Sequence, residues 1–395
     1  MKKIMFLGAA VHQMSPIQYS YNKGYFIITC DNIKSNPGHK IANKSYNVST
    51  VKMEEVLAIA KKEKIDGIMT YASDISANSV AYVSNNLGLP GNSIESVKAL
   101  TNKGIFRKYT NQGIEYKVFK SKKNAISYCN SRKIPFVIKP TDSSGSKGVS
   151  VVSNRESIEL KLSDAFLNSM SKEVIVEDFI SKKNNLQICG DGFMLNNKLK
   201  FICFGDGHFY ESNFSNVPWG ETFPSCVDKK TLRKIKRIIE EILNKLGFGR
   251  GAFNFDVFIK DNGEPFINEI GPRNGGNFIP EIILLQSGVN LIRASVESAL
   301  NEDFSFNETE LIGPNCHASY MIHSKEAGFF KGVTYSKQIK KYIINENIFL
   351  NLNDRVNSFS KGSDAIGNLI LKFETQIEME EIYPFINEHI KVELI

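Results

Sequence analysis

Residues 252–276 read AFNFDVFIKDNGEPFINEIGPRNGG, two apolar strands joined by a turn at residues 260–263. The Asp-Asn-Gly sequence of the turn favours a β-hairpin. In such a hairpin Asp256 and Glu269 fall at nearly opposite positions, so their carboxylates can converge on one face. Two carboxylates together with phosphate oxygens suit Mg²⁺, and Mn²⁺ could take its place. The alternative interpretation is an ordinary surface hairpin with a salt-bridge network.

Arg273 lies just beyond this expected metal pair. A planar guanidinium there suits a transferring phosphoryl group or a substrate carboxylate. Arg273 is therefore a candidate catalytic residue, and Lys139, in the strand described next, is the other.

A second element lies upstream, where the strand at residues 137–140 carries Lys139 and a Ser/Gly loop follows. A lysine supplies a point charge, and small residues let backbone N–H groups turn toward phosphate oxygens. The spacing of a Walker A loop is absent, and on its own such a loop is more typical of a surface turn. The loop residues expected to close over phosphate are Ser143, Ser144, Gly145, Ser146, Lys147 and Gly148.

A third element, EVIVEDFI at residues 173–180, is an apolar strand that ends in Glu177-Asp178-Phe179-Ile180. A flat adenine can hydrogen-bond to backbone groups at such a strand end, with a carboxylate accepting from the exocyclic amine. Acidic strand ends are common, so this segment carries weight only together with the other two.

The remainder of the chain predicts an α/β protein of three units. The first hundred residues alternate strand and helix patterns, which predicts a parallel sheet with ligands beyond the strand C-termini. Residues 8–15 and Ser73-Asp74 follow such strands. The expected units are residues 1–95, residues 96–305 with a small lobe at about 110–185 and a large lobe at about 186–305, and a β-rich domain at residues 306–395.

In order and spacing these residues resemble the ATP-grasp superfamily, and the resemblance covers essentially the whole chain. The combination is specific although each piece is weak. It implies an ATP-grasp fold with a preceding parallel-sheet domain, two α+β grasp lobes and a small β-rich C-terminal domain. That tail resembles the one in biotin-carboxylase-like, purine-biosynthetic and amino-acid-ligase members. The residues that carry the resemblance are Lys103, Lys139, the Ser/Gly loop, the segment 177–180, Asp256, Glu269 and Arg273.

The resemblance also implies roles for these residues with the cofactors ATP and Mg²⁺. Lys103 and Lys139 would contact ATP phosphates under the lid at residues 143–148. Glu177 would bind the adenine amine, with the backbone of residues 178–180 as a hinge. Asp256 and Glu269 would bind magnesium, and Arg273 would stabilise an acyl phosphate.

Three positions depart from the superfamily pattern. Gly271 stands where a metal-binding Asn is usual, which removes one metal ligand. Asp256 replaces a more common Glu and reaches less far. Gln187 aligns with the Glu that usually contacts ribose, and its amide can still hydrogen-bond to ribose hydroxyls.

The expected reaction is ADP-forming ligation of a small-molecule carboxylate to an amine. The alternatives are a carboxylase-type enzyme that activates bicarbonate and a nucleotide-binding regulatory protein without catalysis. Substrate choice is expected in four segments, which are residues 8–15, Ser73-Asp74, the loop 205–220 with Trp219, and residues 274–278. An exposed Trp219 could contact substrate, and packing is an equally good interpretation of it.

The composition fits a cytoplasmic enzyme. The net charge of +7 is spread along the chain, so a nucleic-acid partner is not expected. The six cysteines form no CxxC pair, which argues against a zinc site or a disulfide framework. There is no run of 18 apolar residues, so no membrane association is expected, and a homodimer is a possible assembly.

Overall fold

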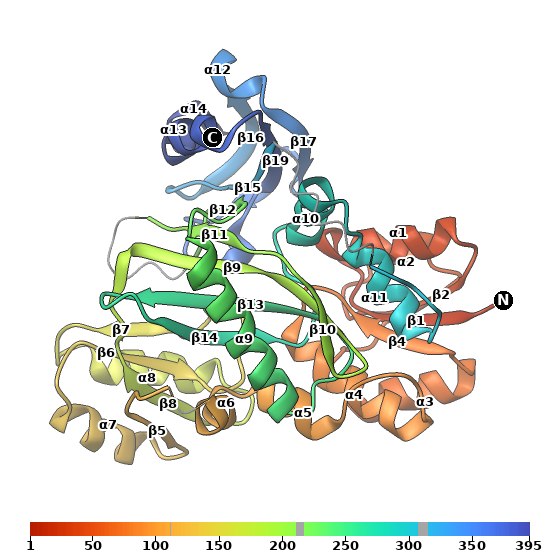
Figure 1. Ribbon diagram of the computed structural model, residues 1–395, viewed down its shortest axis with the longest axis horizontal. Coiled ribbons are helices and arrows are strands. Elements are labelled where there is room, and N and C mark those ends of the chain that lie inside the picture. Colours follow the sequence, from red (N-terminus) through yellow and green to blue (C-terminus); the bar gives the residue numbers. More distant parts are fainter. Residues whose placement is uncertain (111, 211–216, 307–314) are drawn as a thin grey trace.

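A computed structural model describes residues 1–110, 112–210, 217–306 and 315–395. Figure 1 shows a parallel-sheet unit, a small sheet beneath the end of a long curved sheet, and a C-terminal extension above it. Within these ranges no helix is both long enough and apolar enough to cross a bilayer.

The N-terminal unit is a parallel sheet of strand order β3-β2-β1-β4. The βαβ pattern of its sequence is confirmed by these parallel pairings. Asp74 begins α4 directly after β4, so it lies at the carboxyl edge of the sheet. The elements are β1 (Lys3–Leu7), α1 (Met14–Asn22), β2 (Phe26–Cys30), α2 (Gly38–Ile41), β3 (Lys44–Tyr46), α3 (Met53–Glu63), β4 (Gly67–Thr70), α4 (Asp74–Leu87) and α5 (Ile94–Thr101), with a 3₁₀ turn at Val11–Gln13.

The small lobe is an antiparallel sheet of order β5-β8-β6-β7, covered by α7 and α8. All five residues of β6 and the apolar residues of β8 are buried, and Lys139 of β6 lies beside Glu177 of β8. The elements are α6 (Lys103–Thr110), β5 (Tyr116–Phe119), α7 (Lys122–Ser131), β6 (Phe136–Pro140), β7 (Ser150–Val152), α8 (Ile158–Leu167) and β8 (Val174–Asp178).

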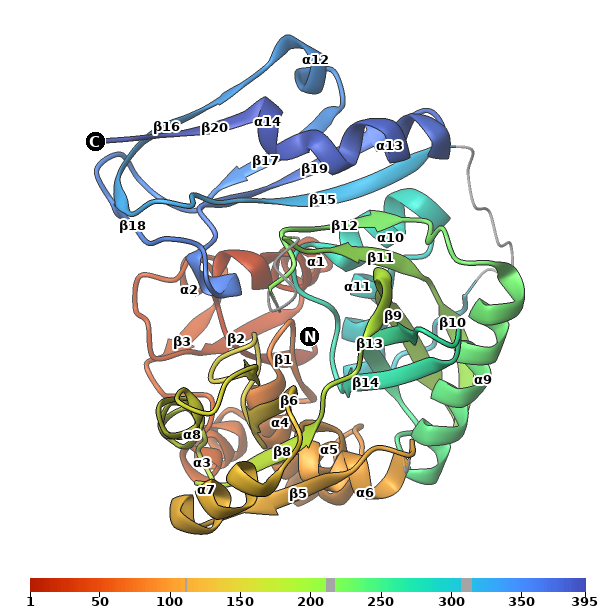
Figure 2. The same cartoon turned by 90° about the vertical axis from the view of Figure 1, so that its left-hand side faces the viewer.

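The large lobe is built on a long antiparallel sheet with helices on it (Figure 2). Alternation along β13 sends Phe253, Phe255 and Val257 into the core beneath α9. The same alternation turns Asn254 and Asp256 to the opposite face. The elements are β9 (Lys182–Leu195), β10 (Lys198–Ile202), β11 (Gly205–His208), β12 (Gly220–Phe223), α9 (Lys229–Lys245), β13 (Gly251–Lys260), β14 (Pro265–Gly271), α10 (Ile279–Ser287) and α11 (Leu291–Ala299).

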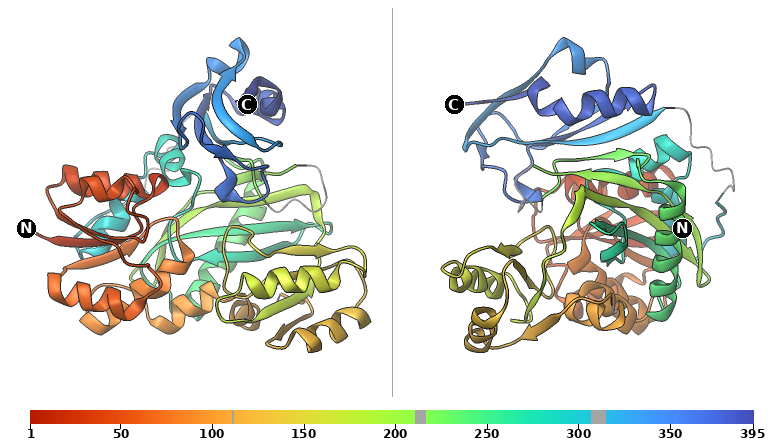
Figure 3. Two further views of the ribbon diagram at one scale, coloured as in Figure 1. Left: turned by 180° about the vertical axis from the view of Figure 1, so that it is seen from behind. Right: turned by 60° about the vertical axis from the view of Figure 1, so that its left-hand side comes forward.

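The C-terminal segment continues that sheet, because β12 pairs with β15 and β15 with β19. The described strands therefore run in the order β14-β13-β9-β11-β12-β15-β19-β17 across the expected boundary at residue 306 (Figure 3). The elements are β15 (Cys316–Ile322), β16 (Gly328–Tyr335), α12 (Lys337–Lys340), β17 (Ile343–Ile348), β18 (Arg355–Val356), β19 (Gly367–Phe373), α13 (Gln376–Ile382), α14 (Ile386–His389) and β20 (Ile390–Leu394), with 3₁₀ turns at Gly362–Asp364 and Tyr383–Phe385.

Candidate functional site

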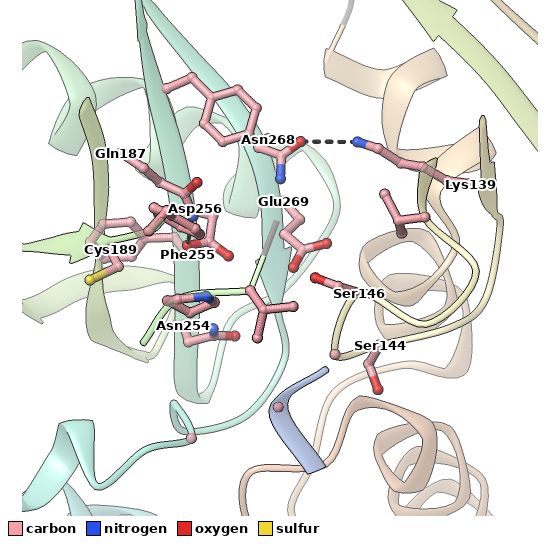
Figure 4. Close-up of a pocket in the computed structure, with 18 of the residues that line it drawn as sticks. Lys139, Ser144, Ser146, Gln187, Cys189, Asn254, Phe255, Asp256, Asn268 and Glu269 are labelled. Carbon is pink, nitrogen blue, oxygen red and sulfur yellow. Dashed lines mark hydrogen bonds between the residues drawn. The ribbon is translucent and has the colours of Figure 1, made fainter. Parts of the chain in front are cut away.

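A cavity of about 360 Å³ lies between the small-lobe sheet and the polar face of the long sheet. Figure 4 shows side chains from both sheets facing each other across it. Most of the residues expected from the sequence line this cavity. They are Lys103, Lys139, Ser143, Ser144, Gly145, Ser146, Glu177, Asp178, Phe179, Ile180, Gln187, Asp256, Glu269 and Arg273, whereas Lys147 and Gly148 do not line it.

The expected metal pair is brought together by the hairpin. Asp256 on β13 is the direct register partner of Glu269 on β14. Burial, and then the neighbouring charge of Glu269, raise the pKa of Asp256 to about 7. Gln187 donates its Nε2 to Asp256 Oδ1 at 2.9 Å, so this amide fixes the carboxylate. The ribose contact expected of Gln187 stays a prediction.

Lys103 joins the Ser/Gly loop to this hairpin. Its Nζ donates to the carbonyl oxygen of Ser143 at 2.7 Å and lies 3.7 Å from Glu269 Oε2. Within the loop, the Ser143 hydroxyl donates to the carbonyl of Lys147 at 2.8 Å. One cation thus lies between the loop and the carboxylate pair, where a polyphosphate would meet both.

A buried ion cluster lies beside the same cavity, which Lys139 and Glu177 line. Glu177 Oε1 is 2.6 Å from Lys139 Nζ, and Glu177 Oε2 accepts from Arg107 Nε at 2.8 Å. Burial alone would raise the pKa of Glu177, but the charges of Arg107 and Lys139 lower it to about 2. Lys139 Nζ also donates to Asn268 Oδ1 at 3.3 Å, drawn as the dashed line in Figure 4.

Arg107 is a site residue that the sequence reasoning missed. It is 2% exposed, and its Nη1 donates to the carbonyl of Asn268 at 2.7 Å. The available signal was its position one helical turn after Lys103 on α6, which puts both cations on one helix face. The carboxylate of Glu177 is committed to two cations, and its expected contact with the adenine amine stays a prediction.

Arg273 is oriented by the N-terminal unit. Its guanidinium binds both oxygens of Asp74, and its Nη1 donates to the carbonyl of Asn274 at 2.9 Å. The following residue, Gly275, donates its N–H to both oxygens of Asp191, a fully buried carboxyl whose pKa burial raises to about 7. The loop that carries Arg273 is therefore held on both sides.

Glu221 on β12 is a second residue that the sequence reasoning missed. It is 3% exposed and lines the cavity, and its Oε1 accepts from Asn277 Nδ2 at 2.7 Å. Its Oε2 is buried without a hydrogen-bond partner among the described residues. Burial raises the pKa of Glu221 to about 8. A single Glu on a short strand gives no sequence pattern that would identify it as a buried cavity residue.

Of the two interpretations of Trp219, the structure favours packing, and the expected exposure was wrong. Trp219 is 5% exposed and stacks on Tyr383 at a centroid distance of 5.3 Å, within the C-terminal core. It does not line the cavity, whereas Val217 and Pro218 beside it do. Residues 211–216 of that expected loop lie outside the described residues.

Comparison with known proteins finds similar enzymes. The family described as D-ala D-ala ligase C-terminus matches residues 106–277. The formate-dependent phosphoribosylglycinamide formyltransferase of Wolinella succinogenes is 28% identical over 278 residues, 69% of this chain and 70% of that protein.

Two solved structures match along the whole chain. The L-amino acid ligase from Bacillus licheniformis has a TM-score of 0.84 at 16% identity, covering 100% of this chain and 99% of its own. The biotin carboxylase domain of the Hydrogenobacter thermophilus 2-oxoglutarate carboxylase, solved with MgADP, ADP and bicarbonate, has a TM-score of 0.76 at 12% identity, covering 100% and 91%. These matches confirm the fold that the resemblance implied.

Proposed function

Because this chain is an ADP-forming ligase of the ATP-grasp superfamily, we propose that it joins a carboxylate to an amine through an acyl phosphate. The observation that carries the proposal is the convergence on one cavity of Asp256, Glu269 and Arg273 with Lys103 and the loop that it holds. Two acidic groups and two cations in one enclosed space fit phosphoryl transfer from a nucleotide.

The donor set fits a divalent cation. Asp256 and Glu269 are hard oxygen ligands at opposed register positions, and the raised pKa of Asp256 reflects burial and a like charge that a cation would relieve. Magnesium bound there would neutralise charge on the transferring phosphoryl group. Gln187 would keep Asp256 turned toward it.

The chain's other residues would bind and orient the reactants. Lys103 lies where it can contact the phosphates together with the loop. Arg273, fixed by Asp74, lines the cavity, where its charge would stabilise the substrate carboxylate and the developing acyl phosphate. The ordering of these groups before the reaction lowers the cost of aligning the two substrates.

The proposed reaction has two steps. A carboxylate oxygen attacks the γ-phosphorus, the bond from that phosphorus to the bridging oxygen breaks, and ADP leaves. The amine nitrogen then attacks the carbonyl carbon, the bond to the phosphate oxygen breaks, and the nitrogen loses a proton. The products are an amide, ADP and phosphate that carries one oxygen of the original acid.

The position of Glu221 favours a substrate that carries an ammonium group. Glu221 lines the cavity with Val217, Pro218 and Ile279, and its buried Oε2 has no hydrogen-bond partner among the described residues. A cation placed there would favour the ionised form of a carboxyl whose pKa burial holds at about 8. We infer that one of the two substrates is an amino acid or a related amine.

The decisive experiment uses ¹⁸O-labelled carboxylic acids. The enzyme is given ATP and Mg²⁺ with amino acids and amines in pairs, and phosphate release identifies the active pair. Mass spectrometry of the phosphate should then show one ¹⁸O per turnover. Label in AMP, or in neither phosphate nor AMP, would exclude the acyl phosphate. Phosphate release that needs bicarbonate instead of the acid would establish the carboxylase alternative.

A variant separates the role of Glu221 from the reaction itself. Glu221→Gln keeps an oxygen for Asn277 but loses the charge. We expect the KM of the ammonium-bearing substrate to rise by roughly 10-fold or more while the KM of ATP stays within about twofold, because a charged hydrogen bond is worth about 1.5–3 kcal/mol. Equal KM values for wild type and variant would remove the ammonium assignment.

A further inference from the structure

Gly271 and Asn254 face each other across the β13–β14 hairpin. They are direct register partners, two pairs along from Asp256 and Glu269. Residues two apart on a strand share a face, so Asn254 lies on the same face as Asp256. Gly271 is the position where the superfamily pattern expects a metal-binding Asn, and here the amide side chain stands on the opposite strand.

The space beside Gly271 is already filled. An ideal Cβ built on Gly271 would lie 2.3 Å from Asn254 Oδ1 and 2.6 Å from Asp74 Oδ1. Neither distance is compatible with a side chain, and Asp74 is held in place by the guanidinium of Arg273. Residue 271 must therefore be glycine for as long as Asn254 occupies this place.

The Asn254 amide oxygen is buried and has no hydrogen-bond partner among the described residues. Burying such an oxygen unpaired costs roughly 1–3 kcal/mol, so a partner is expected. Asn254 lines the main cavity and also a smaller adjoining one, whose other walls include Lys103, Ser143 and Glu269. The unpaired oxygen thus lies beside the space assigned to phosphates and metal.

The carboxylates alone leave a cation with few protein ligands. In the described part of the chain no cluster of three or more His, Cys, Asp or Glu side chains could hold a metal ion. Adjacent residues on one strand face and opposed residues across a hairpin lie within about 5–7 Å, close enough for side-chain oxygens to converge on one ion. A neutral amide oxygen is a usual ligand for Mg²⁺ and Mn²⁺.

We propose that Asn254 supplies the metal ligand that Gly271 lacks, so that Asp256, Glu269 and Asn254 form the protein's three-oxygen set for a divalent cation. This inference rests on the proposed function for the identity of the site. The ligand has moved from one strand of the hairpin to the other, and the glycine at residue 271 makes room for it. Figure 4 shows Asn254, Asp256 and Glu269 on the same side of the cavity.

Binding of Mn²⁺ tests the proposal without any turnover. The free Mn²⁺ signal in electron paramagnetic resonance is titrated with the full chain in the presence of a non-hydrolysable ATP analogue. Asn254→Leu, which has nearly the same shape but no ligand atom, should weaken Mn²⁺ binding by roughly 10–100-fold, the range seen when groups that support a metal are lost. Asn254→Asp keeps an oxygen and should bind Mn²⁺ at least as tightly as wild type.

Two further variants distinguish failure of the Asn254 proposal from failure of the proposed function. Glu269→Gln should abolish tight Mn²⁺ binding, and Asn86→Leu, an exposed position on α4, should leave it unchanged. If Glu269→Gln loses the metal while Asn254→Leu retains wild-type affinity, the role of Asn254 is wrong and the proposed function stands. If the wild type binds no Mn²⁺ with the analogue present, both are wrong. Circular dichroism of each variant establishes that it is folded, and loss of Mn²⁺ by Asn254→Asp to the same extent as by Asn254→Leu would also overturn the proposal.

Discussion

Arg273 and Asp74, 199 residues apart in the sequence, form a bidentate ion pair. Arg273 Nε donates to Asp74 Oδ1 at 2.8 Å and Nη2 donates to Oδ2 at 2.7 Å. The carboxylate comes from the parallel-sheet unit, and the guanidinium follows the β13–β14 hairpin. The first unit of the chain therefore sets the orientation of a residue in the large lobe.

Loss of this pair should affect the rate more than the fold. Asp74→Ala leaves Arg273 with the Asn274 carbonyl and frees its plane to rotate. We expect kcat to fall by roughly 10–100-fold, because small misplacement of an aligning group has effects of this size. Steady-state kinetics at saturating substrates measures it. Glu55→Ala removes an exposed ion pair with Lys52 and should change nothing, and an unaltered kcat for Asp74→Ala would show that Arg273 needs no support.

The Glu177 carboxylate is the centre of a buried charge cluster, and its removal should destabilise the protein. In Glu177→Gln the side chains of Arg107 and Lys139, both under 10% exposed, lose their shared anion. Breaking a buried ion pair by removing one partner costs about 3–5 kcal/mol. The urea midpoint should drop accordingly.

A matched variant tests whether burial is the cause. Glu264→Gln removes the exposed partner of Lys234 and should cost no more than about 1 kcal/mol. Equal urea midpoints for the two variants would mean that the buried cluster contributes no more than a surface pair.

The parts of the site that are local in sequence could be predicted. The Asp-Asn-Gly turn sets the register of the hairpin, and this register places Asp256 opposite Glu269. The position of Lys139 followed from the end of one buried strand. In each case a short segment contained the whole reason for the arrangement.

The remaining contacts join segments that no local pattern relates. Glu177 bonds Arg107, which lies 70 residues away in the sequence. Glu221 becomes a candidate site residue only because the folded chain places it in the cavity wall. Pairing of β12 with β15 likewise joins strands almost a hundred residues apart into one sheet. Such contacts depend on the packing of the finished fold, and spacing along the chain does not encode them.

The Ser/Gly loop at residues 143–148 should respond to nucleotide. Gly145, Ser146 and Gly148 have positive φ angles, and the loop has few apolar side chains to anchor it. Trypsin should cut after Lys147 in the free protein. ATP with Mg²⁺ should slow that cut by roughly tenfold or more, which corresponds to stabilising the closed loop over the open one by about 1.4 kcal/mol. A cut at the exposed Lys230 gives the internal reference, and equal protection of both sites would contradict the lid role.

Glu221 should make the stability of the protein depend on pH. Its folded pKa of about 8 lies above the roughly 4.3 of an unfolded chain, so the folded protein holds a proton that the unfolded chain has released. The stability from this group is full below the unfolded pKa and is lost as the pH rises to about 8. Asp256, Cys189 and Tyr383 are the titratable groups that share its surroundings.

The variant Glu221→Gln has no such proton to lose, so its thermal midpoint should approach or exceed that of wild type as the pH rises. The free energy of unfolding of the variant minus that of wild type should therefore rise between pH 5 and pH 8 by a few kcal/mol, since each unit of pKa is worth about 1.4 kcal/mol. Calorimetry at several pH values measures it, and Glu241→Gln, an exposed residue of α9, serves as the control with no pH trend. An ammonium-bearing substrate at saturation should reverse the order, because only the wild type gains from pairing its charge. A difference that stays constant from pH 5 to pH 8 would show that Glu221 is already ionised in the folded protein.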